Sequence, residues 1–234
     1  PGGGLYRGLL GDVNGDGIDD LIVSAHKARE VYVRFGGSNS PADSALPQAA
    51  NVVITAPADL SWLIAAQVAD FNNDGLTDLL FDTRLADPAD LHGSGPGFLL
   101  WGRTKWPSHI SLPEQADVKL RFDFVTSAGN WSCNVNGKQT DLNGDGISDV
   151  LVGAFDYGDE VRVAMGSLYV LFGRRNWPRE LEVKAAADVT LKGARTGEGF
   201  GHRCAVGDFN GDNKLDLAVH ATETMLWNLL GGRG

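Results

Sequence analysis

Short apolar runs, separated by polar and glycine-rich turns, recur along the chain. Four of them follow directly on an acidic loop, at residues 21–25, 79–81, 150–154 and 217–221. Each run is rich in branched residues, is shorter than an ordinary helix and is bounded by turn residues, which favours a β-strand. The pattern therefore predicts a strand that begins where each acidic loop ends.

Further apolar runs occupy fixed places in the same repeat. After a polar turn, a second strand usually ends in an aromatic residue followed by glycine. A third strand comes next, and a fourth leads into the next acidic loop, as in residues 202–208. The second strands are expected at 31–37, 97–102, 167–173 and 225–232, and the third at 51–56, 116–120 and 187–191. The four-stranded repeats then cover approximately 1–56, 57–121, 122–192 and 193–234.

The acidic loops themselves repeat, with leading residues Asp12, Asp70, Asp141 and Asp208. Their spacing is that of a supersecondary unit rather than of a whole domain. Four-stranded antiparallel units in series are typical of a β-propeller, in which each sheet covers its faces with its neighbours. The sequence therefore predicts an all-β fold over 1–234, a β-propeller of four-stranded antiparallel blades, with an open solenoid of the same units as the alternative.

Counting from its first aspartate, each loop reads D-x-N-x-D-G-x-x-D, with Asn in place of Gly in the fourth. Side-chain oxygens at positions 1, 3, 5 and 9, with the carbonyl of position 7, suit one Ca²⁺ ion per loop, about four in all. Turn chemistry alone would explain one such loop, but not four with every ligand position filled. The predicted metal ligands are Asp12, Asn14, Asp16, Ile18, Asp20, Asp70, Asn72, Asp74, Leu76, Asp78, Asp141, Asn143, Asp145, Ile147, Asp149, Asp208, Asn210, Asp212, Lys214 and Asp216.

Position 6 of the loops supports a sharp turn. Gly17, Gly75, Gly146 and Asn213 are the residue types that best tolerate a left-handed backbone, so each loop is expected to fold back on itself there. An EF-hand is excluded because the loops have no Glu at position 12 and no flanking amphipathic helices.

Composition narrows the classes of partner. With 43% hydrophobic residues the chain can form a substantial core, and its formal charge of −10 argues against nucleic acid or anionic lipid as partners. No run of about 18 apolar residues suggests a membrane span. The first residues do not resemble a signal peptide, so any export signal is expected outside this sequence.

The acidic motif, running into an apolar strand and then an aromatic-Gly segment, resembles the FG-GAP repeats of integrin α-subunit propellers and of secreted bacterial proteins. The resemblance covers nearly the whole chain. Phe200-Gly201 matches the Phe-Gly piece, whereas Gly153-Ala154-Phe155 lacks the proline of the Gly-Ala-Pro piece. The resemblance implies Ca²⁺ at the loop between the first two strands of each blade. It also implies a seven-bladed propeller of which these repeats would form a part, with an imperfectly closed four-bladed ring as the alternative.

The leading hypothesis is a noncatalytic, calcium-binding, extracellular or cell-surface propeller that serves adhesion, protein interaction or assembly. Its partners would be a protein or glycan at the cell surface, or further copies joined through open sheet edges. The alternative is an accessory or carbohydrate-binding module of a secreted hydrolase or lyase. Catalysis by the chain itself is not expected, because the histidines His26, His92, His109, His202 and His220 do not cluster and no G-x-S-x-G motif is present.

Three other features carry smaller expectations. Cys133 and Cys204 fall near the same strand of successive repeats, so they form either a disulfide or two buried thiols. The Trp-Pro pairs at Trp106 and Trp177 lie in register and are predicted to cap the spaces between blades. Trp62, Trp101, Trp131 and Trp227 would be the residues available for stacking on a sugar.

Overall fold

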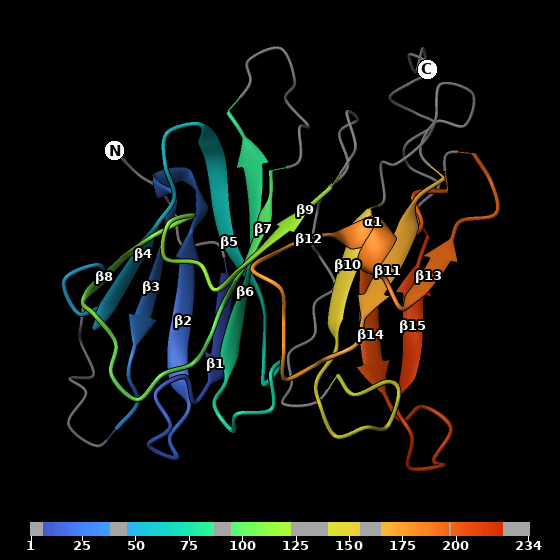
Figure 1. Cartoon of the computed structure of the whole chain (residues 1–234), viewed down its shortest axis with the longest axis horizontal. Coiled ribbons are helices and arrows are strands. Elements are labelled where there is room, and N and C mark those ends of the chain that lie inside the picture. The colour runs from blue at the N-terminus through green and yellow to red at the C-terminus, as the bar shows by residue number, and fades with distance from the viewer. Residues whose placement is uncertain are drawn as a thin grey trace, which may run out of the picture.

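A computed structural model describes residues 7–37, 46–86, 95–122, 140–154, 165–196 and 198–221. Within these ranges nearly all regular structure is β-strand, arranged in sheets that follow one another along the chain (Figure 1). The two helical elements are single turns, η1 (His26–Ala28) and α1 (Val183–Ala186). The predicted all-β class is confirmed, and no described helix is long and apolar enough to cross a membrane.

The first two repeats each form a complete antiparallel blade. The strands of the first blade are β1 (Arg7–Gly11), β2 (Asp20–Ala25), β3 (Glu30–Arg34) and β4 (Val52–Thr55). The strands of the second blade are β5 (Leu60–Ala69), β6 (Asp78–Leu85), β7 (Gly97–Leu100) and β9 (Val118–Arg121). These are the four strands per repeat that the apolar runs predict.

The third and fourth repeats are described in part. The strands of the third are β10 (Val150–Ala154), β11 (Ser167–Leu171) and β13 (Val189–Lys192), and those of the fourth are β14 (Arg203–Gly207) and β15 (Asp216–His220). β10 pairs antiparallel with β11, β11 with β13, and β14 with β15. The strand expected at 225–232 lies outside the described residues.

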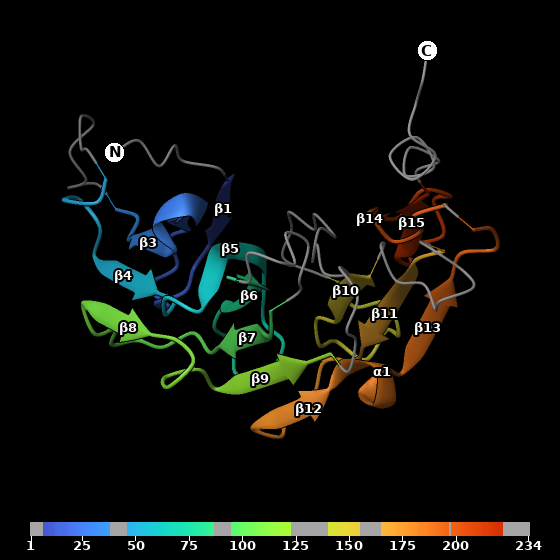
Figure 2. The ribbon, with the colours of Figure 1, turned by 90° about the horizontal axis from the view of Figure 1, so that it is seen from above.

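Two further strands were not predicted. β8 (His109–Ser111) lies in the second repeat but pairs in parallel with β4 of the first, and β12 (Glu180–Glu182) of the third repeat pairs in parallel with β9 of the second. Each is therefore a fifth strand that one repeat adds to the blade before it. Figure 2 shows both along the convex rim of the molecule, outside the blades to which they are added.

The hydrophobic core is divided among the interfaces between neighbouring sheets. One cluster joins the first blade to the second through residues such as Ile22 and Phe81. Another cluster joins the second blade to the third through Leu80 and Tyr169. A smaller third cluster, including Leu151, lies between the third and fourth sheets. The sheets thus stand face against face in a curved row (Figure 2), as the blades of a propeller do. Closure into a ring, and a total of seven blades, stay predictions.

Candidate metal centre

The acidic loops lie together along one edge of the molecule, at the bottom of Figure 1. The first loop connects β1 to β2, the second connects β5 to β6, and the fourth connects β14 to β15; the third leads into β10. Because the first, second and fourth loops each precede the second strand of their repeat and the third leads into β10, the order of the blades brings the four loops into one row.

The first aspartate of each loop organises the loop backbone. Asp12 Oδ1 accepts hydrogen bonds from the N–H groups of Gly15 at 2.7 Å and Asp16 at 3.1 Å, and its Oδ2 accepts from Gly17 at 2.8 Å. Asp141 and Asp208 make the same three bonds, and Asp70 makes the last two. The carboxylate therefore sits inside the loop and holds the chain around itself.

Positions 3 and 5 add a second layer of local bonds. Asn14 Oδ1 accepts from the Asp16 N–H at 2.8 Å, and Asp16 Oδ1 accepts from the Ile18 N–H at 2.9 Å. The same pair of bonds is present in the other three loops. These side chains are thereby oriented by the backbone in the same way in all four repeats.

The backbone turns left-handed twice in every loop. The prediction for position 6 is confirmed, with φ of 86° at Gly17, 89° at Gly75, 88° at Gly146 and 63° at Asn213. Position 4 is left-handed as well, which the sequence analysis missed: φ is 76° at Gly15, 59° at Asn73, 78° at Gly144 and 81° at Gly211. The signal was available, because only Gly and Asn occupy position 4.

The aspartate at position 9 is buried and ties three segments together. Asp78 is fully buried; its Oδ2 accepts from the Phe71 N–H in the loop at 2.8 Å, and its Oδ1 accepts from the Gly102 N–H at 2.9 Å. Gly102 belongs to the aromatic-Gly segment that ends the next strand. Asp20 and Asp149 are buried with equivalent bonds, whereas Asp216 is partly exposed and accepts from Phe209 at 2.9 Å.

Burial and crowding of like charges set the electrostatics of these carboxylates. Burial raises the pKa of Asp78 to about 8; backbone hydrogen bonds oppose the rise, and the nearby Asp74 and Asp70 add to it. The same causes raise the pKa of Asp149 to about 6 and also raise that of Asp20. In the fourth loop, the backbone N–H of Asn213 and its neighbours hold the pKa of Asp208 below its usual range. The ionised form of the carboxyl group is thus most strongly disfavoured at the buried end of the second and third loops.

The chemistry of the donor set fits a hard divalent cation. Each loop offers oxygen ligands, and Oδ2 of the first aspartate, which accepts one backbone hydrogen bond, keeps a lone pair for a metal. In the structure, the side-chain N–H of Asn72 donates to Asp74 at 3.0 Å. Asn143 and Asn210 donate in the same way to the aspartate at position 5 of their own loops. No described His, Cys, Asp or Glu side chains are gathered in threes around a common point. Calcium coordination, including that by the carbonyls of position 7, therefore stays a prediction.

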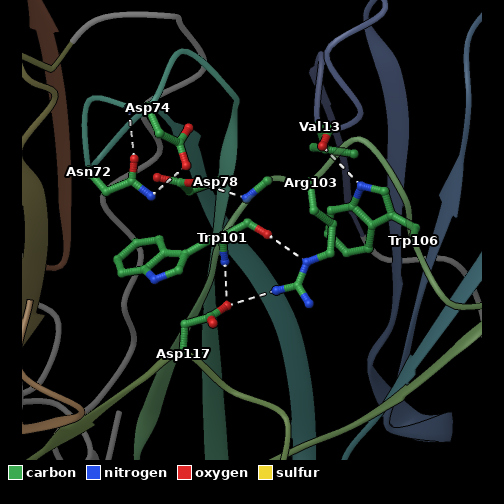
Figure 3. Close-up of polar contacts among 9 residues, drawn as sticks. Val13, Asn72, Asp74, Asp78, Trp101, Arg103, Trp106 and Asp117 are labelled. Carbon is green, nitrogen blue, oxygen red and sulfur yellow. Dashed lines mark hydrogen bonds and ion pairs between the residues drawn. The ribbon is translucent and has the colours of Figure 1, made fainter. Parts of the chain in front are cut away.

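Each of the first two loops is covered by a segment from the following repeat, which we call a strap: residues 102–111 and residues 173–182. In the first junction, the Arg103 N–H and the Trp106 Nε1–H both donate to the Val13 carbonyl at 3.0 Å (Figure 3). The Thr77 N–H also donates to the Asp12 carbonyl at 3.1 Å. Beyond its tryptophan, each strap continues into β8 or β12.

The second junction repeats this arrangement. The Arg174 N–H and the Trp177 Nε1–H donate to the Phe71 carbonyl at 3.1 and 2.9 Å, and the Ser148 N–H donates to the Asp70 carbonyl at 3.2 Å. The expectation that Trp106 and Trp177 cap the spaces between blades is confirmed.

An arginine–aspartate pair fixes the start of each strap. Arg103 Nη2 lies 2.8 Å from Asp117 Oδ2, the same oxygen that accepts the Trp101 N–H at 2.8 Å (Figure 3). The Arg103 guanidinium also lies 5.2 Å from the centre of the Trp106 ring. Arg174 and Asp188 repeat the ion pair at 2.5 Å. Sequence analysis missed this pair, although an arginine after the aromatic-Gly segment and an aspartate before the third strand recur in both repeats.

The remaining candidate residues form no second centre among the described ranges. His26 packs on Trp62, with ring centroids 4.5 Å apart, and His202 lies 6.5 Å from His220. Trp101 and Trp177 have centroids 6.3 Å apart and pack against the second core cluster. Cys204 is buried and is not a free thiol. His92, Trp131, Trp227 and Cys133 lie outside the described residues, so the Cys133–Cys204 pairing stays a prediction.

Comparison with known proteins supports the repeat assignment. The profile of the FG-GAP-like repeat matches residues 12–81. Phosphatidylinositol-glycan-specific phospholipase D of Bos taurus is 36% identical over 116 residues, covering 49% of this chain and 13% of that protein. The protein of the same name from Homo sapiens is 37% identical over 115 residues, covering 48% of this chain and 13% of that protein. Integrin alpha pat-2 of Caenorhabditis briggsae is 26% identical over 238 residues, covering 92% of this chain and 18% of that protein.

These matches confirm the FG-GAP-like repeat and the similarity to integrin α subunits. A secreted bacterial type is not tested by them. The chain spans no more than 18% of the length of these relatives. What the whole relatives do is therefore not a finding about this chain.

Proposed function

We propose that the chain is a noncatalytic propeller module whose four acidic loops each bind one Ca²⁺ ion, and whose function is protein interaction, in adhesion or assembly, outside the cell. The observation that carries the metal assignment is fourfold repetition: the same aspartates and asparagine are oriented by the same backbone bonds in every loop, along one edge of the molecule. A turn does not need several carboxylates close together, because they repel one another, whereas a bound cation needs them as ligands.

Calcium would act on structure rather than on chemistry. Each ion would neutralise the carboxylates at positions 1, 5 and 9 of its loop and so favour the folded arrangement by mass action. In the second loop these are Asp70, Asp74 and Asp78. With Ca²⁺ bound, the edge of the molecule that carries the four loops would then present an ordered surface to a protein partner. The similarity to integrin alpha pat-2 over most of the chain supports an interaction role.

The matched variants Asp145→Asn and Glu114→Gln test the metal assignment. Asn at position 145 keeps the oxygen that accepts the Ile147 N–H but removes one ligand charge. We expect the calcium-dependent rise in melting temperature to shrink in Asp145→Asn, with little change in chelator. Glu114 is exposed and lies outside the loops, so Glu114→Gln should keep the full rise. An unchanged calcium response in Asp145→Asn would remove the third loop from the proposal.

The partial similarity to phosphatidylinositol-glycan-specific phospholipase D favours a second candidate, an accessory or carbohydrate-binding module of a secreted hydrolase or lyase. In that case the chain alone would bind the enzyme's substrate, or a glycan, without converting it. Assays of the chain for phospholipase D activity on a phosphatidylinositol-glycan, alongside a glycan array, separate the two candidates. Turnover by the chain alone would contradict its noncatalytic assignment.

A further inference from the structure

A continuous series of hydrogen bonds runs through the first three acidic loops. In the second repeat, the position 9 aspartate Asp78 accepts from the N–H of Phe71, position 2 of the same loop, at 2.8 Å. It also accepts from the N–H of Gly102, the first residue of the strap, at 2.9 Å. The third repeat has the same two bonds to Asp149, from Leu142 at 2.8 Å and from Gly173 at 2.9 Å. Each of these carboxylates therefore joins its loop to the strap of the same repeat.

The strap carries the series into the loop of the preceding repeat. The Arg103 N–H donates to the Val13 carbonyl at 3.0 Å, and the Val13 N–H donates in turn to Asp20, the position 9 aspartate of the first loop, at 3.0 Å. Figure 3 shows Asp78, Arg103 and Val13 between the second loop and the first. The second junction has the equivalent bond, from Arg174 to Phe71 at 3.1 Å. The position 9 aspartates of the three loops are thus connected without a break.

A second link crosses each junction directly from loop to loop. The Thr77 N–H, at position 8 of the second loop, donates at 3.1 Å to the carbonyl of Asp12, position 1 of the first loop. The second junction has the equivalent bond, from Ser148 to Asp70 at 3.2 Å. Positions 1, 7 and 9 carry predicted metal ligands, so both links end on or beside groups that would contact the ion.

We propose that neighbouring acidic loops bind Ca²⁺ with positive cooperativity, because each loop takes part of its shape from the next repeat. The inference rests on the proposed function and deepens it by naming how the sites regulate one another. When the second loop is filled, Asp78 is held in place, and with it the strap that holds Val13 between the predicted ligands Asp12 and Asn14. The first loop then loses less conformational freedom on binding its own ion, which raises its affinity.

Direct electrostatic interaction between the sites would have the opposite sign. A filled loop carries its carboxylates and a divalent cation, so it is less negative than an empty loop. Charge alone would therefore make a filled loop weaken binding at its neighbour. Coupling through the hydrogen bonds makes a filled loop strengthen it, so the sign of the effect separates the two causes.

Stepwise addition of Ca²⁺ to the chelator-stripped whole chain, followed by nuclear magnetic resonance, tests the proposal. The amides of Gly17, Gly75 and Gly146 each donate to Oδ2 of the first aspartate of their loop, so each resonance reports on one site. We expect Asp145→Asn, which weakens the third site, to raise the Ca²⁺ concentration of half-saturation at Gly75 about 5-fold. Because coupling is reciprocal, Asp74→Asn should raise that at Gly146 by a similar factor. An unchanged or lowered value at the neighbouring loop would overturn the proposal.

Matched tryptophan variants test whether the strap carries the coupling. Trp177→Phe keeps an aromatic ring beside the second core cluster but removes the indole N–H that donates to the Phe71 carbonyl. Trp106→Phe makes the same change at the first junction. The effect of Asp145→Asn on Gly75 should become smaller in Trp177→Phe and stay about 5-fold in Trp106→Phe. Equal effects in the two variants would overturn the proposed connection.

The same spectra separate the coupling from the metal assignment on which it rests. If the three glycine resonances respond to Ca²⁺ but each loop is unaffected by the change in its neighbour, the coupling is overturned and the metal sites stand. If none of the three resonances responds, the metal assignment is overturned, and the coupling with it.

Discussion

The second and fourth loops have almost the same sequence but very different surroundings. In the second loop, Phe71 and Asp78 are fully buried, and Trp177 of the following strap covers the Phe71 carbonyl. In the fourth, the equivalent Phe209 is 60% exposed and Asp216 is partly exposed. Nevertheless the local hydrogen bonds of the two loops agree. The motif thus determines the loop conformation, and the neighbouring repeat determines the burial of its carboxylates.

This difference separates two contributions to the stability of the edge. Local bonds from Asp and Asn side chains shape every loop, because they need only nearby backbone groups. Burial needs a strap from the next repeat, because the strap brings the indole, the ion pair and the extra strand together. Four comparisons of variants or conditions test this difference between the loops.

The largest effect is expected from Trp177→Ala. It removes an indole that packs against the second core cluster and donates a hydrogen bond to the Phe71 carbonyl, so we expect a loss of about 2–4 kcal/mol in the free energy of unfolding. Arg175→Ala, on an exposed neighbour in the same strap, should change it by less than about 0.5 kcal/mol. Urea unfolding measures both. Equal effects would mean that the strap does not close the second loop.

The next effect compares position 9 in the two loops. Asp78→Asn turns an acceptor into an amide that cannot accept from both the Phe71 and Gly102 N–H groups, which should cost about 1–3 kcal/mol at this buried site. Asp216→Asn should cost less, because Asp216 is partly exposed and water can replace a lost bond. Both are measured in chelator by thermal unfolding. A larger loss for Asp216→Asn would reverse the contrast.

A smaller effect concerns the backbone at position 6, where the two loops should differ little. Gly75→Ala has space for its methyl group but forces alanine into the left-handed region, so it should cost about 1–2 kcal/mol. Asn213→Gly should be close to neutral, because Asn and Gly both accept this conformation. Chemical denaturation of the two variants checks the expectation. If Gly75→Ala does not change the free energy of unfolding, the turn relaxes to accommodate alanine.

The smallest effect is a local pH dependence at His202, beside β14 of the fourth sheet. Burial, with Arg203 and His220 nearby, lowers the pKa of His202. The stability that neutral His202 contributes is therefore present above about pH 6.5 and is lost as the pH falls toward the lowered folded value. Hydrogen exchange of β14 should speed up over this range, and His202→Gln should remove the change. If the pH dependence of hydrogen exchange in β14 is unchanged in His202→Gln, a group other than His202 causes it.

The parts of this structure that depend on local chemistry were predictable from sequence. The strand after each loop, the aromatic-Gly strand and the left-handed turn at position 6 follow from apolar runs and from Gly or Asn at fixed places. β8 and β12 were not predictable, because three-residue segments with no distinct apolar pattern become strands only by pairing with another repeat. The double acceptor role of Asp78 was also missed, since Gly102 approaches it only in the folded blade.

The most direct test of the account is a calorimetric titration of chelator-stripped protein with Ca²⁺, with thermal unfolding followed with and without the ion. We expect close to four sites and a large rise in melting temperature on calcium addition. Asp145→Asn should weaken one site and leave the number of the others unchanged. No heat of binding and no change in melting temperature would contradict the account, and the four loops would then be turns alone.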